Sequence, residues 1–258
     1  MAERMNPAPL EGISAIIHLG GENLAQGRWT AAKKQLISDS RLRSTRLLSE
    51  TIARLRPTPK VMLCASATGF YGDRGDEELT EESPPGKSFV ADVCRQWENA
   101  CAPAAAAGIR VVNLRFGVVL SSDGGALEKM LPIFKLGLGG PIGNGRQFLG
   151  WMTLDDAIAA MLHLLDHSSL AGPVNMVAPQ SVTFRQFTTT LGRVLHRPAF
   201  FALPAPMARL MMGEMADQVL LASTRVVPKR LQADGFAFQQ PELEAALRNI
   251  LRKDRKSA

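Results

Sequence analysis

A short apolar run that ends in small, hydroxyl-bearing residues constrains the fold of this chain more than any other feature. Residues 61–64 are continuously apolar, and Ser66, Thr68 and the turn Tyr71-Gly-Asp73 follow directly. Continuous apolar runs of this length are typical of parallel strands that are buried on both faces. Because ligands of open α/β sheets bind at the carboxyl ends of such strands, the residues after the run are expected to line a site.

Segments that predict strands and helices alternate along the chain. Short apolar segments predict strands at residues 13–19, 61–65, 110–114 and 173–177. Longer segments with helical spacing predict helices between them, at residues 30–55, 88–107, 124–136 and 154–167. Such an alternation forms right-handed βαβ units and a parallel α/β sheet with helices on both faces. A further helix is predicted at residues 184–195, and helical segments at residues 204–223 and 241–251 predict a mainly helical C-terminal region.

The charge of the chain bears on its partners. Its 258 residues carry a net charge of +6 at pH 7, which raises the question of nucleic acid. The basic residues are scattered, however, and the densest groups, at residues 41–46 and 252–256, have few aromatic neighbours. A solvated helix face and a basic terminus account for both groups, so no nucleic-acid partner is expected. The positive balance favours a pocket for an anionic cofactor instead.

The cysteines and the hydropathy pattern are typical of a cytoplasmic protein. Cys64, Cys94 and Cys101 are odd in number and lack metal-ligand spacing, so neither a disulfide framework nor a metal site is expected. No apolar stretch reaches the length of a membrane-spanning helix, and the N-terminus has no signal-peptide pattern. We therefore expect a cytoplasmic protein without a membrane partner. The sequence does not predict an oligomeric state.

A series of motifs occurs in order along almost the whole chain. They are His18-Leu-Gly-Gly-Glu-Asn23, Arg28-Trp-Thr30, Ser66-Ala-Thr-Gly-Phe-Tyr-Gly-Asp-Arg-Gly75, Leu114-Arg-Phe-Gly-Val-Val-Leu120, Leu136-Gly-Leu-Gly-Gly-Pro141, Gly150-Trp-Met-Thr-Leu-Asp-Asp156, Gly172-Pro-Val-Asn175, Arg225-Val-Val-Pro-Lys-Arg-Leu231 and Gly235-Phe236. With these motifs the chain resembles the YfcH-like epimerase family of the extended and atypical short-chain dehydrogenase/reductase superfamily. Members of that family carry a small C-terminal domain.

The resemblance implies a fold, a cofactor and a class of reaction. It implies a Rossmann-type NAD(P)-binding domain over residues 1–200 and a small C-terminal domain over residues 201–258. The implied cofactor is NADP, with NAD as the alternative, and the implied partner is a small-molecule substrate. The implied activity is an NADP-linked oxidoreduction or epimerisation of a polar metabolite or nucleotide sugar. The alternatives are a non-catalytic dinucleotide-binding or regulatory module and an inactive truncated fragment.

The N-terminus departs from the pattern of this family. Family members begin with a strand, a glycine-rich turn and a helix, whereas the first predicted strand here starts at residue 13 with no glycine fingerprint before it. We therefore expect an N-terminally truncated sheet with an exposed strand edge beside residues 13–19. The chain would also lack the glycine turn that holds the pyrophosphate. A gene fragment and a naturally shortened protein both fit this pattern.

The position of the usual catalytic pair is a second departure. Typical superfamily members use Tyr-x-x-x-Lys, together with a Ser or Thr on the preceding strand. The pair should fall within residues 87–94, where Phe89 with Val93, or Val90 with Cys94, takes its place.

The remaining hydroxyls supply the catalytic candidates. Ser66 matches the family serine and is predicted to be catalytic; the alternative is a hydroxyl that satisfies local backbone. Tyr71 is the single tyrosine and the second catalytic candidate; the alternative is a packed aromatic side chain.

The cofactor-binding residues follow from the same resemblance. Small residues after the first strand would let the backbone approach the adenosine-diphosphate half of the cofactor. Residues after the third predicted strand would approach the nicotinamide. Arg115 would be partly buried there and need an anion, which a phosphate or a structural carboxylate would both provide. The predicted residues are Leu19, Gly20, Gly21, Ala65, Arg115, Phe116, Gly117 and Val118.

Overall fold

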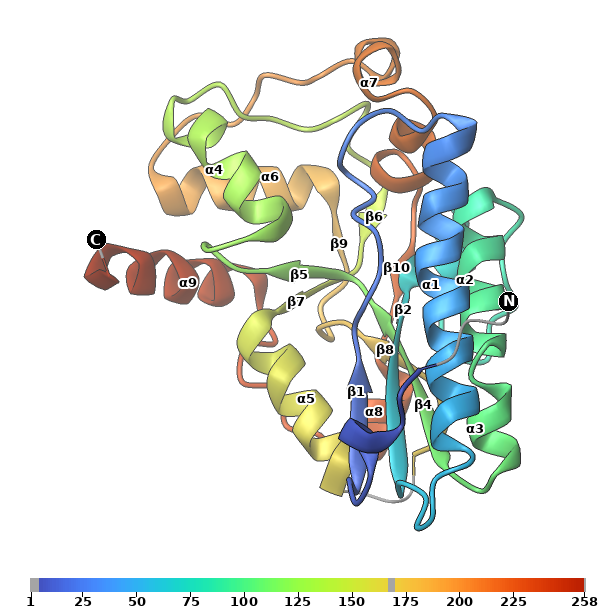
Figure 1. The fold of residues 1–258 in the computed structure, drawn as a ribbon. Helices are drawn as coiled ribbons and strands as arrows, with labels where there is room; N and C mark the ends of the chain where they lie inside the picture. Colours follow the sequence, from blue (N-terminus) through green and yellow to red (C-terminus); the bar gives the residue numbers. More distant parts are fainter. Residues whose placement is uncertain (1–4, 167–169, 258) are drawn as a thin grey trace.

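A computed structural model of the protein describes residues 5–166 and 170–257. Its centre is a parallel sheet of four strands in the order β1-β2-β4-β8 (Figure 1). The strands are β1 (Ala15–His18), β2 (Val61–Ala67), β4 (Arg110–Phe116) and β8 (Gly172–Met176). The middle strand β2 is buried along almost its whole length, as its apolar run predicts.

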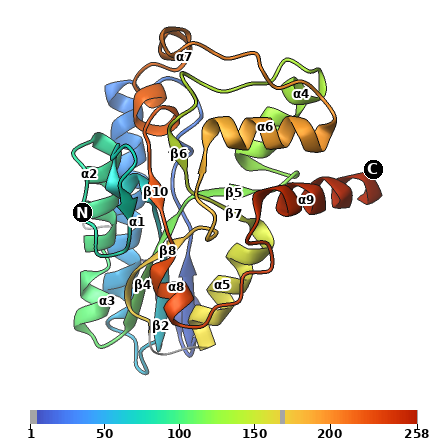
Figure 2. The same cartoon turned by 180° about the vertical axis from the view of Figure 1, so that it is seen from behind.

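Helices cover both faces of this sheet, which confirms the predicted Rossmann-type architecture (Figures 1 and 2). One face packs on α1 (Ala31–Ile52), α2 (Phe89–Asn99) and α3 (Ala102–Ala106), and the opposite face packs on α5 (Leu154–Asp166) and α8 (Lys229–Ala233). Thr30 caps α1, since its side chain accepts a hydrogen bond from the Lys33 amide. The helix predicted over residues 154–167 corresponds to α5, and its predicted last residue, position 167, lies outside the described residues.

Two helices that were predicted to be continuous are each divided into two elements in the structure. The helix predicted over residues 88–107 divides into α2 and α3, because Pro103 occupies the first turn of α3 and has no amide hydrogen to continue α2. The helix predicted over residues 204–223 divides into α7 (Ala205–Met212) and a π-helical turn η3 (Ala216–Leu220). The break falls at Gly213, whose φ of 63° lies in the left-handed region.

A second layer of structure lies beyond the carboxyl ends of the strands. It contains β5 (Val118–Leu120) paired with β7 (Trp151–Thr153), and a core in which Trp151 and Phe187 pack against Leu247. Its helices and small strands are α4 (Gly125–Lys135), α6 (Phe184–Leu195), α9 (Leu243–Ser257), β6 (Phe148–Leu149), β9 (Val182–Thr183), β3 (Glu78–Leu79) and β10 (Arg225–Val226), with the 3-10 turn η2 (Thr68–Tyr71). A separate 3-10 turn, η1 (Ala8–Leu10), precedes β1 in the chain. Because α9 packs into the same core as α6, the domain boundary at residue 200 stays a prediction.

Strand β1 forms one edge of the sheet. Among the described strands it pairs only with β2, and Ile17 is 44% exposed beside that edge. The exposed strand edge expected at residues 13–19 is therefore present in the described part of the chain.

Helix α5, which packs on one face of the sheet, carries an exposed apolar stripe at every fourth residue, formed by Leu154, Ile158 and Leu162.

Candidate functional site

The predicted site residues gather at one edge of the central sheet. Because the four strands are parallel, their carboxyl ends lie together, and each leads into a loop on the same side (Figure 1). The register pairs His18 with Cys64 and Ser66 with Arg115, which places the ends of β1, β2 and β4 side by side. Within this edge, the residues divide into an exposed loop after β1 and a buried polar network beneath β2 and β4.

The loop after β1 is open to solvent. Leu19 is 53% exposed, and Gly20 and Gly21 are exposed as well. A Cβ atom on Gly21 would lie 3.0 Å from the Arg41 guanidinium carbon, so the backbone lies directly against that cation. An exposed apolar side chain, two glycines and a neighbouring cation fit the adenosine-diphosphate half of a dinucleotide.

A second layer of side chains holds this loop in place. His18 Nε2 lies 3.0 Å from the Thr45 hydroxyl, and that hydroxyl also accepts a hydrogen bond from Trp97 Nε1 at 2.8 Å. Burial lowers the pKa of His18, so its imidazole is neutral at pH 7. The Glu22 amide donates to the Ser40 hydroxyl at 2.9 Å. These contacts tie the loop to α1 and leave its outer surface free.

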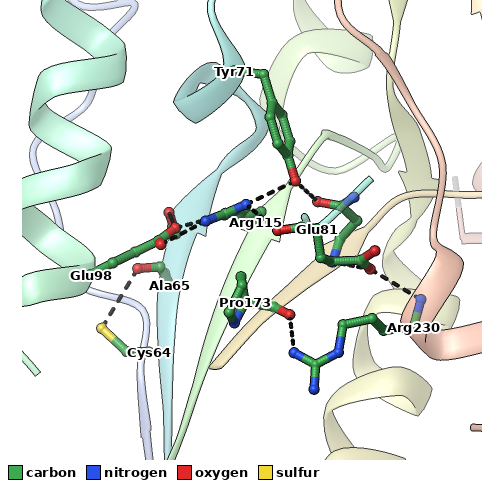
Figure 3. A network of polar contacts seen from close by, with 10 residues as sticks. Cys64, Ala65, Tyr71, Glu81, Glu98, Arg115, Pro173 and Arg230 are labelled. Carbon is green, nitrogen blue, oxygen red and sulfur yellow. Dashed lines mark hydrogen bonds and ion pairs between the residues drawn. The ribbon is translucent and has the colours of Figure 1, made fainter. Parts of the chain in front are cut away.

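Arg115 is the centre of the buried network (Figure 3). Its Nε and Nη2 atoms donate to the two carboxylate oxygens of Glu98 at 2.8 and 2.9 Å, and its guanidinium lies 3.5 Å from the ring centroid of Phe70. The side chains of Arg115 and Glu98 are only 4% and 11% exposed. A structural carboxylate therefore provides the anion that Arg115 was expected to need.

The two predicted catalytic hydroxyls both belong to this network. The Ser66 hydroxyl donates to Glu98 Oε1 at 2.7 Å, and the Tyr71 hydroxyl donates to Asn175 Oδ1 at 2.6 Å. Tyr71 is completely buried, and burial raises the pKa of its phenol. The catalytic role of Ser66 and Tyr71 stays a prediction, because each hydroxyl is occupied by a buried partner.

Sequence reasoning did not identify the carboxylates of this network. Glu98 follows Cys94 by four residues and precedes Cys101 by three, so it shares the inward face of its helical segment with two buried cysteines. A charged residue on an otherwise apolar stripe is the sequence signal that could have identified Glu98. Glu81 accepts hydrogen bonds from the amides of Asn175 and Arg230 through Oε1, while its buried Oε2 accepts none from the part of the chain that the structure describes. No pattern in the sequence connects Glu81 with Asn175 and Arg230.

The other predicted cofactor contacts lie in packed surroundings. Ala65 is buried in β2, and a Cβ atom on Gly117 would lie 2.5 Å from the Gly150 carbonyl oxygen. Val118 begins β5, and its amide donates to that same carbonyl at 2.8 Å. Phe116 is half-buried against the cores on both faces of the sheet. Internal packing thus accounts for the small residue at 117, and a cofactor contact at these positions stays a prediction.

The usual position of the catalytic pair is filled by packing residues. Phe89 stacks edge-on against Trp29 with ring centroids 5.6 Å apart, and Val93 is buried. Cys94 is also buried, and burial raises the pKa of its thiol to about 12. None of these side chains exchanges a proton near neutral pH.

The described residues contain neither a cluster of metal ligands nor a helix that could cross a membrane. Within residues 5–166 and 170–257, no group of three or more His, Cys, Asp or Glu side chains is arranged to hold a metal ion. Across the same ranges, no helix combines the length and the apolar character needed to cross a membrane.

A parallel sheet covered on both faces, with a glycine loop at the carboxyl end of its edge strand, defines a Rossmann-type α/β protein. A sequence model of the NAD dependent epimerase/dehydratase family matches residues 4–177, and a domain of unknown function, DUF1731, matches residues 203–250. The chain belongs to this epimerase/dehydratase family.

Named relatives agree with this assignment. The epimerase family protein Mb2239 of Mycobacterium bovis is 40% identical over 242 residues, which are 94% of this chain and 80% of the relative. Human epimerase family protein SDR39U1 is 36% identical over 245 residues, which are 94% of this chain and 83% of the relative. A crystal structure of human SDR39U1 with NADPH matches the fold at a TM-score of 0.90 and 34% identity, covering 93% of this chain and 82% of that one.

Proposed function

We propose that the chain binds NADP(H) at the carboxyl edge of its sheet, with NAD(H) as the alternative cofactor. The observation that carries this proposal is the accessible loop of Leu19, Gly20 and Gly21, held against a cation at the end of β1. The human relative with the same fold was crystallised with NADPH, which supports the choice of cofactor. The glycines let the backbone approach a phosphate, and Leu19 offers an apolar contact to a base.

The proposed reaction is an NADP-linked oxidoreduction or epimerisation of a polar metabolite or a nucleotide sugar. When bound, the nicotinamide of the cofactor supplies or accepts a hydride. Ser66 and Tyr71 remain the proposed catalytic residues. For either hydroxyl to bind substrate, it has to exchange its present acceptor, Glu98 or Asn175, for a substrate oxygen.

The proposed location of the protein in the cell is the cytoplasm.

The test of cofactor binding is a calorimetric titration of the chain with NADPH and with NADH. We expect saturable binding of NADPH with one site per chain. Failure of both dinucleotides to bind would refute the proposal. A positive result leads to a turnover assay with carbonyl compounds and nucleotide sugars, in which Ser66→Ala and Tyr71→Phe are compared with the unmodified chain.

A second candidate function is a dinucleotide-binding module without hydride chemistry. The apolar residues at the usual catalytic pair favour it, since Phe89, Val93 and Cys94 offer no group for proton transfer near pH 7. Such a module would bind NADPH in the titration and leave it unoxidised with every substrate. A measured turnover that is lost in Ser66→Ala or Tyr71→Phe would exclude this candidate.

A further inference from the structure

Arg41 occupies an inward position on α1, where a cation is costly. Ile37 and Thr45, four residues before and after it, are both buried, so all three side chains share the face of α1 that packs on the sheet. Arg41 itself is half-buried, whereas Arg43 and Arg46 on the same helix have side chains 65% and 57% exposed. The prediction that the basic group at residues 41–46 is a solvated face is therefore wrong for Arg41.

The charge of Arg41 has no carboxylate partner. Its Nη1 and Nη2 atoms donate to the backbone carbonyls of Ile37 at 3.2 Å and Glu22 at 3.0 Å. Among the described residues, no carboxylate lies within ion-pair distance of Arg41, and the nearby Glu22 carboxylate pairs with Lys33. Backbone carbonyls satisfy donors but carry no net charge. Glu22 acts on the charge of Arg41 only from a distance, so a half-buried cation in this state would gain from an anion that binds directly.

The guanidinium is fixed in position and faces the open loop. It lies 5.0 Å from the Trp97 ring on one side. On the other side it lies against Gly21, where a Cβ atom would be 3.0 Å from Cζ and 3.2 Å from Nη2. Arginine has five N–H donors, and the two carbonyl contacts leave donors free for a further acceptor. Gly20 and Gly21 are exposed, so the loop that lies against the guanidinium is open to solvent.

We propose that Arg41 is the anion-binding residue of this site and holds the pyrophosphate of the dinucleotide beside Gly20 and Gly21. The inference rests on the proposed cofactor function. A planar guanidinium binds two phosphate oxygens at once, and it is favoured where phosphate recognition needs fixed geometry. Arg41 provides this contact within the described residues.

The experiment is a calorimetric titration of the 258-residue chain and its variants with NADPH and with NADH. Arg41→Gln removes the charge and keeps polar atoms, and we expect it to weaken the binding of both dinucleotides about tenfold or more. Arg43→Gln is the matched control, because it removes the same charge from an exposed position on the same helix that pairs with Asp39 at 3.1 Å. We expect Arg43→Gln to bind both dinucleotides within about twofold of the unmodified chain.

The outcomes separate the inference from the function on which it rests. If the unmodified chain binds NADPH and Arg41→Gln binds it equally well, the role of Arg41 is refuted and the proposed function stands. If Arg41→Gln loses affinity for NADPH but not for NADH, Arg41 contacts the 2′-phosphate and the pyrophosphate assignment is wrong. If the unmodified chain binds neither dinucleotide, the proposed function and the inference both fail.

A second variant covers the case in which Arg41→Gln unfolds. Gly21→Ala keeps the arginine but places a methyl group against its guanidinium, at an exposed position with φ outside the left-handed region. We expect Gly21→Ala to fold, as judged by its circular dichroism and Tm, and to bind both dinucleotides more weakly. Unchanged affinity in a folded Gly21→Ala would contradict the proposed contact.

Discussion

Removal of Arg115 is expected to destabilise the protein strongly in the absence of any cofactor. In Arg115→Met, the buried Glu98 carboxylate loses two hydrogen bonds at 2.8 and 2.9 Å and keeps only the Ser66 hydroxyl. Removing one partner of a buried ion pair costs about 3–5 kcal/mol, because the other charge is left uncompensated. In a chain of this size that loss corresponds to a decrease in Tm of about 6–20 °C.

The assay is urea unfolding followed by circular dichroism at pH 7, with Arg46→Met as the control. Arg46 pairs with Glu50 at 2.6 Å, but their side chains are 57% and 39% exposed, so we expect a loss of about 0–1 kcal/mol. The double variant Arg115→Met/Glu98→Leu removes both buried charges, and we expect it to regain part of the stability lost in Arg115→Met.

One result would refute this reasoning. If Arg115→Met lost less than about 1 kcal/mol without cofactor, the pair with Glu98 would not be the main role of the arginine. A simultaneous loss of NADPH binding would then identify a cofactor phosphate as the anion of Arg115. That alternative was left open by the sequence.

Three further predictions concern the same region. Tyr71→Phe removes a buried hydrogen bond to Asn175 and another accepted from Arg115 Nη1 at 3.0 Å, and we expect a loss of about 1–3 kcal/mol in urea unfolding, while retained turnover would exclude Tyr71 as the proton donor. Gly86→Ala places a methyl group against the backbone of Tyr71, and we expect a loss of about 1–3 kcal/mol; stability within 0.5 kcal/mol of the parent, measured the same way, would show that this contact relaxes. The pKa of the Cys94 thiol is raised from 9.0 to about 12, so the unfolded chain ionises this thiol at a lower pH than the folded chain does. The contribution of Cys94 to the free energy of unfolding is therefore complete below pH 9 and is lost as the pH rises toward 12. Urea unfolding at pH 7, 9 and 11 measures this decline, and a free energy of unfolding that stays constant would contradict it.

Much of the fold followed from the sequence, for identifiable physical reasons. β2 was predictable because its two faces are both buried, which requires a continuous apolar run. The start of α1 was predictable because Thr30 is a good N-cap residue before a helical stripe. The breaks at Pro103 and Gly213 were missed because the apolar spacing continues across them, although proline and a left-handed glycine both interrupt a helix.

The candidate site was harder to predict because its contacts join distant segments. Ser66 and Tyr71 lie at the predicted sheet edge, but their partners Glu98 and Asn175 are 32 and 104 residues away in the chain. A hydroxyl at a strand end has the same local sequence whether it faces a ligand or a buried carboxylate. Only the packing of α2 and β8 against that edge decides between the two.

Arg115 and Arg41 show why a buried charge locates a site better than a hydroxyl does. Both arginines lie at inward positions near the carboxyl edge of the sheet, and each needs an anion for the same electrostatic reason. Arg115 finds one in Glu98, 17 residues before it, so its requirement is met within the chain, and its contact with a cofactor stays a prediction. Arg41 donates to backbone carbonyls, has no ion-pair partner within the described residues, and lies against an exposed glycine loop. We expect the ligand to supply the anion for Arg41. Arg41, rather than Arg115, therefore marks the position where a dinucleotide phosphate is expected to bind.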